Sequence, residues 1–223
     1  MTRIPTPQLG RRHVIGALAV SAAASALPRL PALAAPPSLV PTPRQTTGPF
    51  YPVDWAGDVD NDLVIVRGEA ARALGYVTHI TGRILDTRGA PIAGAQVEIW
   101  QCDNNGHYLH TGDRAARGRR DQGFQGRGRM ASSADGSYSF RTIKPVPYPG
   151  RTPHIHFAIT TAGAPSLVTQ MYVADDPLNE RDGLLRSIRD ARQREMVLVR
   201  LAPAEGLEPG ALAGTFDIVL PTT

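Results

Sequence analysis

Two predicted strands flank a turn in the stretch Val77-Thr78-His79-Ile80-Thr81-Gly82-Arg83-Ile84-Leu85, Asp86-Thr87-Arg88-Gly89-Ala90-Pro91 and Ala95-Gln96-Val97-Glu98-Ile99-Trp100. β-branched residues that alternate with polar ones are typical of strands, and clustered Asp, Gly and Pro are typical of turns. The pattern recurs downstream, where Ser137-Tyr138-Ser139-Phe140-Arg141-Thr142-Ile143 follows the turn pair Asp135-Gly136. These segments predict a β-protein.

Four further strands are predicted, whereas helix spacing is confined to one segment. The strands cover residues 154–161, 167–173, 195–201 and 215–220. Only residues 184–194 have the spacing and composition of a helix. Residues 112–129, rich in Gly and Arg, are expected to form a long loop of the kind that is often functional. Short strands separated by turns predict an all-β sandwich or barrel with long loops and one short helix.

The first 35 residues differ from the rest of the chain. The twin arginine Arg11-Arg12 precedes an uncharged stretch, residues 14–27, which is followed by the small-residue pattern Ala32-Leu33-Ala34. This order predicts a twin-arginine-type signal peptide and export to the periplasm or the cell exterior. The uncharged stretch is shorter than the ~20 residues that span a bilayer, so no stable membrane anchor is expected. The alternative is an Ala-rich amphipathic helix of a cytosolic protein.

The basic character of the chain belongs to this segment. The protein has 24 basic and 20 acidic residues, and Arg3, Arg11, Arg12 and Arg29 precede Ala35 with no acidic residue among them. Without those four arginines the remainder holds 20 basic and 20 acidic residues, and it has no dense basic block interleaved with aromatics. Nucleic acid is therefore not an expected partner. Cys102, the only cysteine, is expected to be a small packed residue.

Candidate metal ligands occur in Pro153-His154-Ile155-His156-Phe157, because residues two apart on a strand point to the same face. Two adjacent imidazoles fit either a metal site or a pair of hydrogen-bonded core histidines. Nearby tyrosines favour the metal: Tyr148 lies between stiffening prolines in Pro147-Tyr148-Pro149-Gly150-Arg151, and Tyr108 lies in a turn just after a strand. Either tyrosine alone would more often be a half-buried ring with a hydrogen-bonded hydroxyl.

The ligand types indicate the metal. No cysteine pair and no carboxylate lies within ligand spacing of the two histidines, which weakens zinc and the two-His-one-carboxylate iron(II) site. A phenolate is a hard anionic donor whose free pKa is ~10, so it ionises at neutral pH only beside a strong positive charge. Iron(III) supplies that charge, and copper(II) is the alternative metal.

At this point the sequence resembles the intradiol ring-cleavage dioxygenases, the family with protocatechuate-type and catechol-type members. The resemblance runs from Gln45 to Ile188. Its motifs, in order, are Gln45-Thr46-Thr47-Gly48-Pro49-Phe50-Tyr51-Pro52, Gly94-Ala95-Gln96-Val97-Glu98-Ile99-Trp100-Gln101, Asp135-Gly136-Ser137-Tyr138-Ser139-Phe140-Arg141-Thr142-Ile143-Lys144-Pro145, Pro153-His154-Ile155-His156-Phe157 and Thr169-Gln170-Met171-Tyr172. Several separate motifs in the right order make a specific match.

The resemblance implies a fold, a cofactor and a reaction. The fold is a β-sandwich with a prealbumin-type core, and the reaction inserts both atoms of O₂ into a catechol-type aromatic diol to give a cis,cis-muconate-type product. By position, the iron(III) ligands are Tyr108, Tyr148, His154 and His156. Tyr148 corresponds to the ligand that the diol displaces and is the candidate base, Arg151 to a basic residue that stabilises substrate charge, and Gln170 to a pocket residue. Arg151 could instead be a surface arginine, and Gln170 a strand residue whose side chain bonds to backbone.

The expected organisation is a signal peptide at residues 1–35, an extended N-terminal arm at 36–75 and a β-sandwich catalytic domain at 76–223. The sequence shows no counterpart of the helical N-terminal domain of the catechol-type members. The span from Tyr148 to His154 is shorter than in the best-studied members of the family, so the pocket wall that it builds is expected to be reduced. The chain could form homo- or hetero-oligomers. The alternative function is a non-catalytic, transthyretin-like β-sandwich binding module, because residues 82–100 also resemble such domains. A binding module would have no need of the four metal ligands Tyr108, Tyr148, His154 and His156.

Overall fold

The computed structural model describes residues 1–2, 38–116, 118–162 and 167–221. The chain divides into two units, Met1–Ala35 and Pro36–Thr223, of which the second holds the fold. Arg11, Arg12 and the rest of the predicted signal sequence lie outside the described residues. Within those ranges, no helix is long and apolar enough to cross a membrane.

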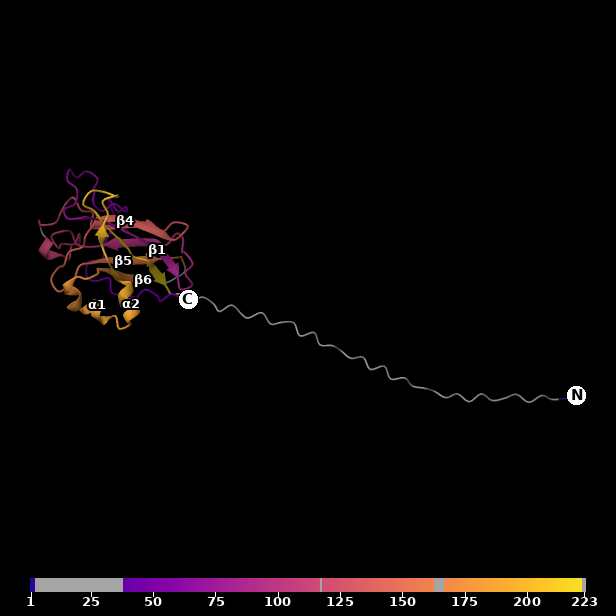
Figure 1. Ribbon diagram of the computed structural model, residues 1–223. Coiled ribbons are helices and arrows are strands. Elements are labelled where there is room, and N and C mark those ends of the chain that lie inside the picture. Colours follow the sequence, from indigo (N-terminus) through magenta and orange to yellow (C-terminus); the bar gives the residue numbers. More distant parts are fainter. Residues whose placement is uncertain (3–37, 117, 163–166, 222–223) are drawn as a thin grey trace. The chain divides into compact units, whose positions relative to one another are not determined.

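Two five-stranded sheets make up the second unit (Figure 1). The first sheet has β1 at its centre and comprises β10 (Ile218–Leu220), β1 (Val77–Asp86), β9 (Leu212–Thr215), β8 (Ala202–Pro203) and β4 (Ser137–Ile143). The second sheet runs in the order β3 (Arg127–Ala131), β2 (Gln96–Trp100), β5 (His154–Thr160), β6 (Leu167–Val173) and β7 (Leu198–Val199).

The sheets pack face to face around one apolar core. Alternate residues of each strand point inward, as with Val97 and Ile99 of β2, which are fully buried in the core cluster. The ring of Phe157 on β5 lies 6.0 Å from that of Tyr138 on β4 and 5.1 Å from that of Phe216. The predicted all-β sandwich is confirmed, which decides between the sandwich and the barrel.

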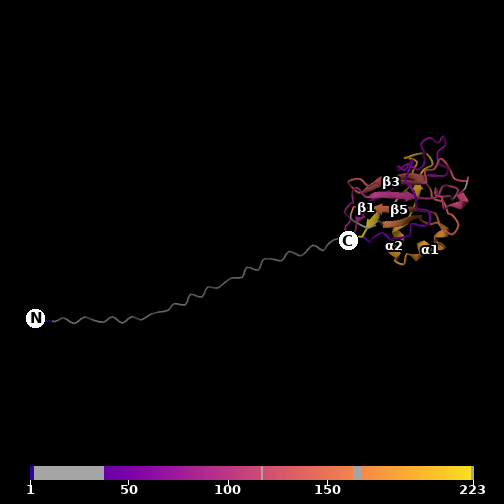
Figure 2. The ribbon, with the colours of Figure 1, turned by 180° about the vertical axis from the view of Figure 1, so that it is seen from behind.

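The helical region differs from the prediction. In place of one helix over residues 184–194 there are two short ones, α1 (Gly183–Ser187) and α2 (Ala191–Met196). Each begins at its own N-cap, because the carboxylates of Asp182 and Asp190 accept the first free backbone N–H groups. Figures 1 and 2 place both helices on the side of the second sheet, away from β1. Two single turns are 3₁₀-helical: η1 (Arg114–Ala116) and η2 (Pro177–Glu180).

Two strand predictions and one loop prediction also need correction. The prediction of a strand at residues 195–201 is wrong over most of that range, because α2 continues to Met196 and β7 has only two residues. The strand expected at 215–220 is split at Phe216 and Asp217, where the Asp217 side chain replaces a backbone partner by accepting from Arg83 N. The predicted 112–129 loop ends early, because β3 begins at Arg127 and continues to Ala131. The strand was not predicted because its Gly and Arg residues give no alternation of apolar and polar side chains.

The part of the arm that the structure describes, residues 38–75, runs over both sheets without a helix or a strand longer than an isolated bridge. Its backbone N–H groups bond to the sandwich at Thr87 O, Val219 O and Val168 O, at 2.7–2.9 Å. Cys102 is buried near it, and burial raises the pKa of its thiol to about 12, so it is the packed residue that was predicted.

Candidate metal centre

The strand register aligns a row of side chains on the outer face of the second sheet. Trp100 of β2 pairs with His156 of β5, which pairs with Gln170 of β6, and His154 pairs with Tyr172. Ile155 and Phe157 alternate with the histidines and belong to the inner core. Both imidazoles therefore face away from that core, as their spacing predicted.

The two histidines point ring nitrogens at one another. His154 Nε2 and His156 Nε2 are 3.2 Å apart, and His154 Nδ1 lies 2.6 Å from the carbonyl oxygen of Thr152. That carbonyl can only accept, so the proton sits on Nδ1 and Nε2 offers a lone pair. Trp100 stacks on His156 at 4.7 Å with the planes 9° apart, which fixes the second ring.

Burial keeps both imidazoles neutral. It lowers the pKa of His154 to about 4, with a further contribution from Arg151, and lowers that of His156 well below its usual value. His156 Nδ1 is buried and has no hydrogen-bond partner within the described ranges. Two neutral imidazoles with converging lone pairs are good ligands for a cation and poor partners for each other.

Tyr108 completes one side of this cluster. Its side chain is buried, and its hydroxyl oxygen lies 3.5 Å from His154 Nε2. Asp113 Oδ2 accepts from the backbone N of Tyr108 at 2.8 Å and holds the loop in place. The ring of Phe50 stacks on Tyr108 at 4.8 Å. Burial raises the pKa of Tyr108 well above its usual value, so its phenol ionises only if a cation lies beside it.

Tyr148 lies beside Tyr108, at the more exposed edge of the cluster. Its ring meets that of Tyr108 edge-on at 5.5 Å and lies 5.4 Å from that of His154. Burial raises the pKa of Tyr148 as well, although the side chain is only half-buried. Two neutral nitrogen donors and two phenol oxygens thus converge, and a hard, highly charged cation fits this donor set. In the described part of the chain no three His, Cys, Asp or Glu side chains are grouped to hold a metal, so the phenols would have to take part.

Arg151 is anchored against the same cluster. Its Nε donates to Asp182 Oδ2 at 2.8 Å and its Nη2 to Gln170 Oε1 at 2.6 Å. Its Nη1 lies 3.4 Å from the hydroxyl of Tyr148 and 3.3 Å from His154 Nε2. The side chain is 14% exposed, which rules out the surface-arginine interpretation.

The arm covers the site. Gln45 Oε1 accepts from Gln170 N at 3.0 Å, and Gln170 Nε2 donates to Thr46 O at 3.2 Å. Gly48 follows at φ +69°, and a Cβ there would lie 3.4 Å from Cε1 of His156. The arm therefore passes directly over the second histidine.

All six predicted site residues thus meet in one place, and their chemical roles stay predictions. Sequence reasoning missed Trp100, Tyr172 and Asp182 as members of the site. Trp100 could be found once β2 and β5 are aligned, whereas Asp182 is 31 residues from Arg151 and no local pattern links them. Tyr172 ends the motif at residues 169–172, two residues after Gln170, and therefore faces the same side of the strand as Gln170.

The cavities near these residues differ in what lines them. One of about 330 Å³ adjoins the site and is lined in part by Tyr148, Arg151 and Arg181. Another, of about 220 Å³, lies between the arm and the 103–127 loop and contains none of the six predicted residues. The first, which Tyr148 and Arg151 line, is connected to the candidate chemistry.

Comparison with known proteins agrees with this geometry. A family model described as Dioxygenase matches residues 46–222. The protocatechuate 3,4-dioxygenase beta chain of Burkholderia cepacia is 36% identical over 185 residues, which cover 79% of this chain and 78% of that protein. The hydroxyquinol 1,2-dioxygenase of Corynebacterium glutamicum is 32% identical over 164 residues, and the chain spans about half of its length.

Solved structures match over the sandwich. The dioxygenase domain of a dioxygenase carbohydrate-binding protein fusion from Streptomyces sp. SirexAA-E is 32% identical, with a TM-score of 0.64 over 82% of this chain and 100% of that one. An intradiol ring-cleavage dioxygenase from Tetranychus urticae, 24% identical with a TM-score of 0.64, shares the fold. Since the family model spans most of the chain and a curated relative matches across the same region, the protein belongs to the intradiol ring-cleavage dioxygenase family.

Proposed function

We propose that the protein is a non-haem iron(III) dioxygenase that opens a catechol-type aromatic diol between its hydroxyl-bearing carbons, with a cis,cis-muconate-type product. The observation that carries this proposal is the convergence of His154 Nε2 and His156 Nε2, 3.2 Å apart, beside two phenols. Tyr108, Tyr148, His154 and His156 would hold the iron. When bound, iron(III) would supply Lewis-acid chemistry that draws electron density from the diol ring and prepares the ring for O₂.

The two tyrosines have different roles because their surroundings differ. Tyr108 is almost fully buried and tied to its loop, so it stays in place. Tyr148 is only half-buried and borders a cavity, so it can move aside when the diol arrives. Its phenolate oxygen then takes a proton from a diol hydroxyl. Arg151, beside that oxygen, stabilises the negative charge that builds up on the substrate.

The deciding experiment is a visible absorption spectrum of the purified protein, with metal analysis of the same sample. A broad charge-transfer band and iron equimolar with the chain are expected, followed by ring opening of a catechol under O₂. Copper in place of iron would make the protein a different metalloprotein. A protein that stays colourless after iron loading would overturn the proposal and favour the binding module.

We further propose export by the twin-arginine route, on the strength of the residues around Arg11 and Arg12. Because this route carries folded proteins, the iron would be taken up before export. Replacement of both arginines by lysine is expected to leave the protein in the cytoplasm, as fractionation would show. Unchanged export would contradict this proposal without affecting the proposed reaction.

A further inference from the structure

The cavity beside Tyr148 lies at the short segment of chain between Tyr148 and Arg151. Arg151 N donates to Tyr148 O at 2.9 Å, which closes a tight turn, and a Cβ on Gly150 would meet no atom within 4 Å. The cavity measures about 330 Å³, and Leu178 and Arg181 are among the residues that line it. This volume lies at the lower end of the roughly 300–1,000 Å³ of small-molecule pockets, so it can hold a substituent of several atoms.

Two charged groups in its lining satisfy each other. The carboxylate of Asp182 is fully buried and accepts from four N–H groups: Leu184 N, Leu185 N, Arg151 Nε and Thr152 N. Arg151 is therefore neutralised by Asp182, and its Nη2 is already bonded to Gln170. Its Nη1 is directed at Tyr148 and His154, where the diol would bind. Neither Asp182 nor Arg151 is therefore free to pair with an anionic group beside Leu178 and Arg181.

Arg181 is the remaining charge of the lining. The residue is exposed, and its side chain has no ion pair with any residue that the structure describes. It follows η2, which is fixed at its start by the Asp176 cap and by a bond from Asn179 Nδ2 to Val173 O at 2.9 Å. The cavity thus combines an apolar wall at Leu178 with one unpaired positive charge on an anchored segment.

We propose that this cavity is a subsite for an anionic side arm carried by the diol, with Arg181 as its counter-ion. The inference rests on the proposed function, in which the diol contacts Tyr148. The preferred substrates are ortho-diols whose ring bears an arm of several atoms ending in a carboxylate. The apolar part of the arm packs on Leu178, and the carboxylate pairs with the guanidinium.

The test compares two ligands that differ in charge alone, dihydrocaffeate and its primary amide. Each is titrated anaerobically into the iron-loaded protein, and the shift of the visible band reports binding without turnover. The native protein is expected to bind the acid about tenfold tighter, which is the scale of one hydrogen bond to a charged group. Added salt should weaken binding of the acid more than that of the amide.

Variants assign the preference to one side chain. Arg181→Gln is expected to bring the ratio of the two dissociation constants close to one, whereas Arg181→Lys keeps most of it. Arg186→Gln is the matched control, because Arg186 is exposed on α1 and outside the cavity lining. This control should keep the full tenfold ratio.

The outcomes separate the two proposals. If the native protein binds acid and amide equally, or Arg181→Gln keeps the preference, the subsite is wrong while the diol chemistry stands. If neither ligand changes the spectrum and no diol is opened, the proposed function fails and the subsite fails with it.

Discussion

A closed set of hydrogen bonds fixes the guanidinium of Arg151 beside the histidines. Gln170 Oε1 accepts from Arg151 Nη2 at 2.6 Å and from the hydroxyl of Tyr172 at 3.1 Å. That hydroxyl accepts in turn from Gln45 Nε2 at 2.7 Å, and Gln45 Oε1 accepts from Gln170 N. Tyr172 and Gln45 are therefore positioning residues that act on Arg151 through Gln170.

Tyr172→Phe should loosen this set without emptying the metal site. The change removes two hydrogen bonds, the one to Gln170 Oε1 and the one from Gln45 Nε2, and leaves Gln45 Nε2 without its partner. This costs about 1–3 kcal/mol of the free energy of unfolding. We expect iron content and the visible band to stay unchanged while kcat falls roughly tenfold, because Arg151 is less well oriented. Tyr76→Phe, on an exposed tyrosine, is the control. Normal kcat in Tyr172→Phe would refute the positioning role.

Arg151→Ala tests the charge itself. The variant should keep its iron and its colour, because Arg151 is not a proposed ligand. Turnover is expected to fall roughly 10²–10³-fold, as when preorganised charge stabilisation is removed from other active sites. Metal analysis and steady-state kinetics check both parts, with Arg200→Ala, an exposed arginine, as the control. Loss of the metal would show that Arg151 supports the ligands instead.

At the scale of elements, the loop that carries Tyr108 is held by carboxylates. Asp103 Oδ1 accepts from Asn105 N at 2.8 Å and His107 N at 3.0 Å, and Asp103 Oδ2 accepts from Asp121 N at 2.7 Å. One buried side chain thus replaces a ladder of backbone bonds and ties the two ends of the loop together.

Asp103→Ala should disorder this loop while the sandwich remains folded. Loss of three bonds to a carboxylate is expected to cost about 3 kcal/mol or more. Tyr108 would then be misplaced, so the visible band should weaken although the far-ultraviolet circular dichroism still reports β-structure. Asp135→Ala is the matched control, because Asp135 accepts from Ser137 N in a turn between β3 and β4. It should leave the band intact; an intact band in Asp103→Ala would contradict the prediction.

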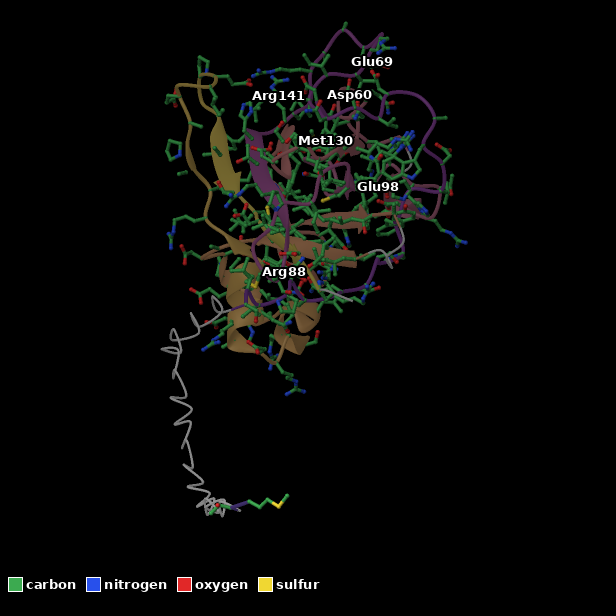
Figure 3. All side chains as sticks on the ribbon, turned by 90° about the vertical axis from the view of Figure 1, so that its right-hand side faces the viewer. Asp60, Glu69, Arg88, Glu98, Met130 and Arg141 are labelled. Carbon is green, nitrogen blue, oxygen red and sulfur yellow. The ribbon has the colours of Figure 1, made fainter. Side chains whose placement is uncertain are left out.

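At the scale of the molecule, Arg141 on β4 joins three distant parts of the chain. It pairs with Asp62 of the arm at 2.9 Å and with Glu208, before β9, at 2.7 Å. Figure 3 shows Arg141 next to the arm segment that carries Asp60, at the end of the domain far from Arg88. The side chains are 20–38% exposed, so solvent screening limits their contribution.

Arg141→Met should lower the free energy of unfolding by about 1 kcal/mol at neutral pH without changing the visible spectrum. The bond from Arg141 lowers the pKa of Glu208. A carboxyl with a lowered folded pKa stabilises the fold above its unfolded pKa of about 4.3 and loses that effect as the pH falls. The difference between native and variant protein should therefore shrink below pH ~4.

Urea unfolding of metal-free protein at several pH values measures this difference. Arg88→Met is the control, because Arg88 is 79% exposed and pairs with Asp86 of its own turn. Its effect should stay below about 0.5 kcal/mol. A pH-independent difference for Arg141→Met would mean that packing, and not the ion pair, carries the effect.

Local patterns gave the elements wherever period and turn chemistry agree. β1, β2, β4, β5 and β6 lie within a residue of their predicted bounds, because inward residues alternate and turn residues flank them. The edge strand β3 was not predicted, because β2 is its one strand partner among the described residues and its sequence has little apolar alternation. The break between α1 and α2 carried a readable signal, because Asp182 and Asp190 are both N-cap residues.

The sequence by itself determined the all-β class, the shared face of His154 and His156, and the family, because these depend on strand period and on motifs of adjacent residues. Only the tertiary structure decided that Asp182 neutralises Arg151, that Trp100 stacks on His156 and that Arg181 borders the open cavity. Such contacts join residues far apart in the chain. The register between strands and the path of the loops bring these residues together, and a local sequence pattern specifies neither of them.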